Sequence, residues 1–222
     1  MKQTQTTAPL TTGGIIVVAA YTAAQMLSDI MSLKIALVGG LTVDAGTFIY
    51  PFTFTIRDLI HKLLGKRAAR VVIISAGVIN LIMAGALGFA AWLPADPAWP
   101  HQEAFVAVLG PTWRIVIASI LAEVISEMVD TEMYSLWIRR ITRKAQWSRV
   151  LASNAVSVPV DSLIFSWLAF GQFGGLFPSG LPAGTVWAIF WANVLIKGAI
   201  TLVSLPSIYL VPEKKRLSPG SS

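Results

Sequence analysis

The sequence predicts an all-α integral membrane protein with six transmembrane helices and both termini in the cytoplasm. Of its 222 residues, 55% are hydrophobic and only 13% are charged, whereas about a quarter of the residues of a soluble domain are charged. Several apolar stretches approach or exceed the roughly 20 residues that a helix needs to cross a bilayer. Basic residues gather in alternate connections between these stretches. The composition therefore excludes an ordinary soluble globule, and the absence of cysteine excludes disulfides and thiolate catalysis.

The six spans form a single membrane domain over residues 1–222. They are expected at about residues 11–31, 33–56, 71–93, 113–138, 150–170 and 185–211. The first follows a single lysine and has no convincing cleavage site, so it is expected to be a retained helix and not a signal peptide. The last contains Pro206 and is expected to tilt or kink near its end. Residues 212–222 are expected to form a flexible tail.

The distribution of cations sets the predicted orientation. The connections 57–70 and 139–149 hold five lysines and arginines each, residues 214–216 hold three, and Lys2 brings the number to 14 of 17. The connections 94–112 and 171–184 carry almost no basic charge. The positive-inside rule then places both termini and the basic connections in the cytoplasm. The net charge of +6 thus serves orientation, and no nucleic-acid partner is expected.

Polar residues recur at helical spacing within four of the predicted spans. The stretch LAEVISEMVDTEMY (121–134) places three acids and a tyrosine on one helix face, at spacings of four, three and four. Charged groups deep in a bilayer cost several kcal/mol, so they indicate a functional site. The candidates are Asp44; Glu123, Glu127, Asp130 and Tyr134; Asn154, Ser157 and Asp161; and Asn193, Lys197 and Thr201.

Three segments share the pattern Val-Asp-small-x-x-aromatic: VDAGTF (43–48), VDTEMY (129–134) and VDSLIF (160–165). Each places an aspartate one turn before a ring on the same helix face, and these rings are Phe48, Tyr134 and Phe165. The spacing suits a planar ligand bound by the acid and stacked on the ring, although coincidence gives the same pattern. The alternative interpretation is that the acids have a structural role, in interhelical hydrogen bonds or in ion pairs with Arg114 and Lys197. We expect Lys197 to be held by a carboxylate, most plausibly Asp161 or Glu127.

No enzyme signature is evident. His61 and His101 have no partner at metal-ligand spacing, so no metal or cofactor is expected. The spacing of Glu123 and Glu127 also occurs in membrane-embedded, metal-dependent phosphatases, which makes such an enzyme an alternative. That chemistry would require several arginines at the site, and only Arg114 lies within a predicted span.

Residues 39–70, 114–140 and 147–171 resemble the queuosine precursor transporters, which are six-span proteins of the bacterial inner membrane. The shared features are YPFTF…RD…GK..AR in the first segment and the R…AS..AE..SE..D and R…SN..S..VDS..F pair in the others. Where the family often has a glutamate before the GK..AR block, this chain has Lys62, Leu63 and Leu64.

The resemblance implies uptake of 7-cyano-7-deazaguanine or related 7-deazaguanines for tRNA modification. The expected site is a polar cavity at mid-membrane. An acid would accept hydrogen bonds from the N1–H and N2–H₂ donors of a guanine-like ring, and an aromatic ring would stack on its face. Lys197 or an asparagine would donate to its acceptors. The helices are expected to be surrounded by membrane lipid. The sequence leaves open the oligomeric state, the energy coupling, and whether the chain acts alone or as the substrate-binding subunit of a larger transporter.

Overall fold

The computed structural model describes residues 12–140, 146–173 and 180–204, and a few side chains inside these ranges are excluded. Helices dominate it, and one β-hairpin follows the first helix. The elements are α1 (Thr12–Met31), β1 (Ile35–Val38), β2 (Leu41–Asp44), the 3₁₀ helix η1 (Ala45–Phe48), α2 (Tyr50–Leu64), α3 (Lys66–Trp92), α4 (Gln102–Leu109), α5 (Thr112–Arg140), α6 (Gln146–Phe170) and α7 (Ala183–Ser204).

Five stretches of the described chain are long and apolar enough to cross a membrane, so the multi-pass helical architecture is confirmed. These stretches are Thr12–Met31, Arg67–Trp92, Gln102–Asp130, Leu151–Phe170 and Ala183–Val203. They correspond to five of the six predicted spans. Pro206, the end of the last predicted span and the tail at 212–222 lie outside the described residues.

The span predicted at 33–56 is wrong as a continuous helix. β1 pairs with β2 in an antiparallel hairpin that joins Ile35 to Asp44. Its two-residue turn consists of Gly39 and Gly40, with φ of 58° and 84°, which are the left-handed values that such turns require and that glycine adopts without strain. The 15 residues of α2 extend only about 22 Å, which is less than the roughly 30 Å of a bilayer's hydrocarbon core.

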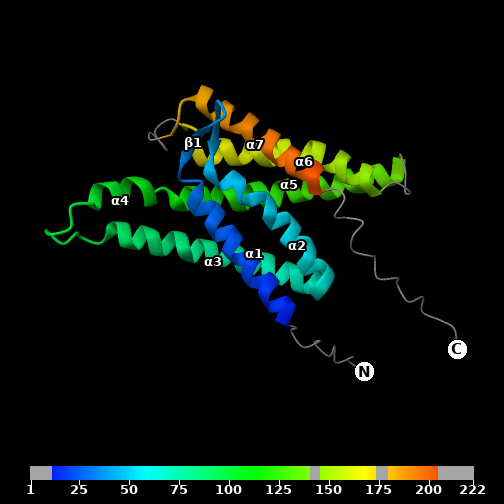
Figure 1. Cartoon of the computed structure of the whole chain (residues 1–222), viewed down its shortest axis with the longest axis horizontal. Coiled ribbons are helices and arrows are strands. Elements are labelled where there is room, and N and C mark those ends of the chain that lie inside the picture. Colours follow the sequence, from blue (N-terminus) through cyan, green and yellow to red (C-terminus); the bar gives the residue numbers. More distant parts are fainter. Residues whose placement is uncertain (1–11, 141–145, 174–179, 205–222) are drawn as a thin grey trace.

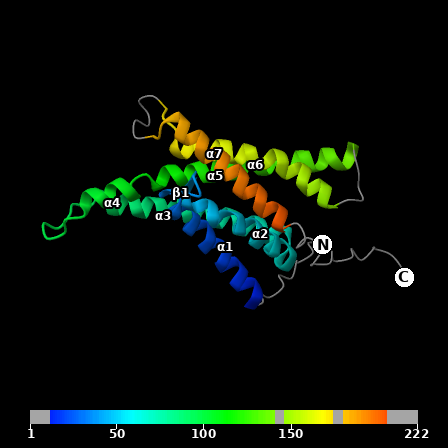
Figure 2. The same ribbon diagram turned by 45° about the horizontal axis from the view of Figure 1, so that its top comes forward.

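The helices lie side by side along the long axis of the molecule, and α1 and α2 lean obliquely against them (Figure 1). In both views the first turn of α1, the connection from α2 to α3, the end of α5 and the last turn of α7 lie toward the same end (Figure 2). These are the parts of the chain that flank the predicted basic connections. Within the described part of the chain, the basic segments beside these connections therefore lie toward one end.

Three buried hydrophobic clusters hold the described helices together. Ile115 of α5, Phe165 of α6 and Ile189 of α7 belong to one cluster, and Tyr21 of α1 and Ile60 of α2 belong to another. Many apolar side chains point outward instead. On α3 they recur at helical spacing along one face: Val71, Ile74, Val78 and Ile82, each at least half exposed. An outward apolar stripe of this kind is typical of a helix in contact with lipid.

Candidate functional site

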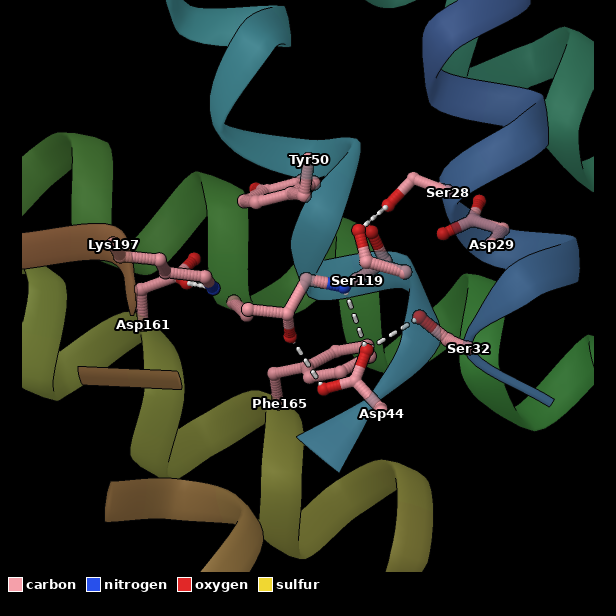
Figure 3. Close-up of a pocket in the computed structure, with 12 residues that line it drawn as sticks. Ser28, Asp29, Ser32, Asp44, Tyr50, Ser119, Asp161, Phe165 and Lys197 are labelled. Atoms are coloured by element: carbon pink, nitrogen blue, oxygen red, sulfur yellow. Dashed lines mark hydrogen bonds and ion pairs between the residues drawn. The ribbon is translucent and has the colours of Figure 1, made fainter. Parts of the chain in front are cut away.

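The pocket of interest lies where α1, the β2–η1 segment, α2, α5, α6 and α7 meet (Figure 3). About 290 Å³ of space lies between its lining atoms, part of it open to solvent. The free space is narrow and has room for only about one water molecule. Its lining consists of Ser28, Asp29, Ser32, Asp44, Gly46, Thr47, Tyr50, Ser119, Ala122, Asp161, Phe165 and Lys197.

A buried ion pair forms one wall of the pocket. Nζ of Lys197 lies 2.5 Å from Oδ2 of Asp161, and both side chains are only 5% exposed. The ammonium also lies 4.5 Å from the ring centroid of Tyr50 and 5.9 Å from that of Phe165, within the range of cation–π attraction. The predicted pairing of Lys197 with a carboxylate is confirmed, and Asp161 is the partner. The hydroxyl of Ser126 donates a longer hydrogen bond of 3.4 Å to the same aspartate.

Asp44 forms the opposite wall and organises the backbone around it. Its carboxylate caps η1, accepting from the backbone N–H of Thr47 at 3.1 Å and from the Thr47 hydroxyl at 2.7 Å. It also accepts from the hydroxyl of Ser32, just after α1, at 2.9 Å. The Thr47 hydroxyl contacts Oδ1 of the fully buried Asn193 on α7. Nδ2 of Asn193 is left without a partner among the described residues.

The three acids that share one face of α5, Glu123, Glu127 and Asp130, do not line the pocket. Glu123 accepts from the hydroxyl of Tyr21, and Glu127 pairs with Arg57 at 3.1 Å. Asp130 accepts from Ser157 at 3.3 Å. The three acids therefore contact three different helices: α1, α2 and α6. For these residues the structural alternative accounts for the observed contacts.

The structure describes both side chains at two occurrences of the aspartate–aromatic pattern besides the one that ends at Tyr134, and at one of these two the pair forms a pocket wall. Asp161 and Phe165 both line the pocket, whereas Phe48 is 40% exposed and lies outside it. The reason is local: residues 45–48 form a 3₁₀ helix of about three residues per turn, so four residues rotate the side chain by about 120°. Tyr134 lies on α5, but its side chain is outside the described part of the structure. Asn154 on α6 is half-buried and is not a lining residue.

Sequence reasoning missed the contribution of α1. Ser28 and Asp29 reach the pocket from this helix (Figure 3), and Asp29 accepts from Nδ2 of Asn80 on α3 at 2.7 Å. A signal was present, because Gln25 and Asp29 stand four residues apart in an otherwise apolar span and both are buried. Tyr50 was also missed, because the predicted second span placed it near the end of a helix and not at the start of one.

Arg114 holds the far end of α6 and takes no part in the pocket lining. Its Nε donates to the carbonyl of Leu168 at 2.7 Å, and a second guanidinium nitrogen donates to the carbonyl of Gly171. A cation at a helix C-terminus stabilises the carbonyl groups that the helix leaves unpaired. The described residues hold no group of three or more His, Cys, Asp and Glu side chains that could bind a metal ion.

Comparison with known proteins identifies the class of molecule to which this pocket belongs. A family model described as "Putative vitamin uptake transporter" matches residues 44–211, which is more than half of the chain. The chain belongs to this family. It is also 30% identical over 208 residues to a Bacillus subtilis (strain 168) protein named "Probable queuosine precursor transporter", a match that covers 88% of this chain and 84% of that protein. No solved structure gave a significant match.

Membership in this transporter family decides between the classes left open by the sequence. The chain is a multi-pass membrane protein of a transporter family, which is not a family of enzymes. The phosphatase-type alternative, based on the spacing of Glu123 and Glu127, is therefore excluded. In the structure these two acids bind different helices instead of facing a common site.

Proposed function

We propose that the chain imports 7-deazaguanine queuosine precursors, such as 7-cyano-7-deazaguanine, across the bacterial inner membrane through the pocket described above. The name of the Bacillus subtilis relative supports the solute class. The observation that carries the proposal is the buried Lys197–Asp161 pair beside the rings of Tyr50 and Phe165. Together with Asp44, this wall offers acceptors, a donor and aromatic faces to a small planar solute.

The chemistry of a guanine-like ring complements this wall. Its N1–H and N2–H₂ groups point in one direction, so a single carboxylate can accept from both. Asp161 is the candidate acceptor, and Lys197 is the candidate donor to the O6 or cyano group. Tyr50 and Phe165 supply the aromatic faces on which the ring would stack. Because the pocket is too narrow for a bicyclic ring, these groups move apart when the solute enters.

The orientation proposed is the one that the cations favour. The basic end of the molecule faces the cytoplasm, where the positive-inside rule places it. Import then carries the solute from the end bearing α4 toward the end where α2 joins α3.

Uptake of labelled 7-cyano-7-deazaguanine tests this proposal in cells that cannot synthesise it and that express this chain alone. We expect accumulation with the wild-type chain, loss with Asp161→Asn, and wild-type rates with Glu103→Gln, a matched change at an exposed position on α4. An adenine-like ring has an acceptor at N1 and lacks the N2 amine. Sites built on such hydrogen bonds discriminate by about 10⁴.

Competition by unlabelled guanine, 7-deazaguanine and adenine identifies which hydrogen-bonding edge of the ring the site recognises. Strong competition by 7-deazaguanine and none by adenine is the expected pattern. Equal inhibition by adenine would show that Asp161 does not read the donor edge. Accumulation that appears only when further proteins are co-expressed would show that the chain is a substrate-binding subunit.

A further inference from the structure

A ladder of polar side chains begins at the pocket and leads away from it between α1 and α5. On α1, residues Tyr21, Gln25 and Asp29 are spaced by four and are all buried. On α5, Ser119 and Glu123 have the same spacing and face them. We call these five residues the α1–α5 ladder. Spacing of four places each set on one helix face, so the five residues follow the seam between the two helices.

Each rung of the ladder is a side-chain contact. The hydroxyl of Ser119 lies beside the carboxyl of Asp29, and both residues line the pocket. Tyr21 donates to Oε1 of Glu123, and Gln25 donates to Oε2, both at 3.3 Å. Nε2 of Gln25 also lies 3.1 Å from the Tyr21 hydroxyl. The ladder thus connects a carboxyl in the pocket wall with a carboxyl one turn farther along α5.

The ladder leads to the basic end of the molecule. Glu127 lies one turn beyond Glu123 on α5, and its side chain is 43% exposed where it pairs with Arg57. The eight steps along the helix from Ser119 to Glu127 extend about 12 Å along its axis. Beyond them, α5 ends at Arg139 and Arg140. A series of ionisable and hydroxyl groups therefore reaches from the pocket to the more open part of α5.

Two buried amides beside the ladder carboxyls are suited to groups that change protonation state. Asn80 donates to Asp29, and Gln25 donates to Glu123. The oxygen of each amide is buried without a donor among the described residues, and both side chains are at most 5% exposed. A protonated carboxyl is a donor, and an amide that turns over can accept from it through this oxygen. Each amide can therefore serve its carboxyl in either state.

Other charged groups surround the two carboxyls from every packed helix. Glu123 is within electrostatic reach of Arg57 on α2, Glu127 on α5 and Asp161 on α6. Asp29 is within reach of Glu123. The hydroxyl of Tyr50, on α2, is within reach of both Asp161 and Glu123. Protonation of Glu123 is thus sensitive to Asp161, which the proposed solute would contact.

We infer that Asp29 and Glu123 form a proton relay between the pocket and the basic end, and that solute import is coupled to proton movement along it. The inference rests on the proposed function. A proton taken up with the solute at Asp29 is passed on to Glu123, which lies within electrostatic reach of it. It then leaves by way of Glu127 into the cytoplasm, and both carboxyls return to their starting state. One proton per solute makes import of a neutral solute electrogenic.

Purified full-length chain in liposomes tests the coupling, with labelled 7-cyano-7-deazaguanine as the probe. Exchange of labelled for unlabelled solute without a gradient measures transport itself. Accumulation under a gradient of one pH unit, acidic outside, measures coupling, and one proton per solute gives about tenfold accumulation. We expect Glu123→Gln to retain exchange within about twofold and to lose the gradient-driven accumulation. Glu103→Gln, the same change at an exposed position, is expected to retain both.

The outcomes separate the two proposals. Wild-type exchange with no response to the gradient would overturn the relay and leave the proposed function in place. A full response in both Glu123→Gln and Asp29→Asn would also overturn it, and the second variant covers the case in which the first does not fold. Failure of the wild-type chain to exchange the solute would refute the proposed function, and the relay with it.

Discussion

The Lys197–Asp161 pair offers a test in which stability and transport respond differently. We consider Lys197→Met, Asp161→Asn and the double variant that combines them. Each single change leaves one charge in a position that is 5% exposed, without its partner at 2.5 Å. Breaking a buried ion pair in this way destabilises a protein by about 3–5 kcal/mol. Lys197→Met also removes the contact with the Tyr50 ring, which contributes about 0.5–2 kcal/mol.

The double variant removes both charges, so neither is left uncompensated. Replacing a buried pair with neutral side chains of similar volume is often close to neutral. We therefore expect the double variant to be more stable than either single variant, with a coupling of about 4 kcal/mol or more between the two sites. For a chain of this length, 1 kcal/mol corresponds to about 2–4 °C in Tm. Each single change should thus lower Tm by about 6–20 °C, and the second should restore most of it.

Thermal unfolding of the purified protein in detergent measures stability, and uptake of labelled precursor measures transport. All three variants should fail to transport, because the proposed acceptor or donor is gone even where stability returns. Lys34→Met, at an exposed lysine, is the control and should change neither. Additive losses in the double variant would refute the pairing argument. Normal transport by the double variant would refute the assignment of these groups to the solute.

Three further predictions follow from the packing and the charge pattern. Gly46→Ala should destabilise the protein by about 1–3 kcal/mol in thermal unfolding, because a Cβ there would overlap α1 backbone and a serine hydroxyl. At Gly77 a Cβ would meet open space, so Gly77→Ala should stabilise the protein by up to about 1 kcal/mol. Arg114→Lys should cost about 1–3 kcal/mol in the same assay, since an ammonium cannot bond both carbonyls at the end of α6 with the guanidinium's geometry. A periplasm-active reporter should be active when fused at Ala98 and silent at Gln146, and the reverse would overturn the orientation.

The long helices could be predicted because length and apolar composition suffice to identify them. α3 was expected at 71–93 and is observed over Lys66–Trp92. The segment at 33–56 has a similar composition, but its structure depends on two residues. Gly39 and Gly40 provide the left-handed turn of a hairpin, and a Gly-Gly pair flanked by apolar residues was the available signal. Composition alone does not distinguish a hairpin followed by a short helix from one continuous span.

The ion pair of the site could be predicted because electrostatics determines which residue a buried charge contacts. The contacts of the α5 acids could not, because helix packing determines them. A buried lysine requires a carboxylate, which is why Asp161 could be named as a partner of Lys197. The stripe of Glu123, Glu127 and Asp130 was expected to face one cavity because the three share a helix face. However, α5 is 29 residues long and crosses different neighbours along its length. One face of α5 therefore meets α1, then α2, then α6, and the positions of those helices are not encoded in the spacing of the acids.

The broken segment between β2 and α2 explains how a narrow pocket could open. Irregular backbone at membrane depth is tolerated where protein buries it or where it lines a cavity, and transporters place such breaks at their binding sites. Here the break contributes Asp44, Gly46 and Thr47 to the pocket. Its attachments to the region after α1 and to α7 include the hydrogen bonds of Asp44 and Thr47, each of which contributes only about 0.5–1.5 kcal/mol. Separating α6 from α5 or α7 would instead break up the hydrophobic cluster that contains Phe165. Asp44 is therefore a group at which a bound solute could compete for the hydrogen bonds that hold the β2–η1 segment in place.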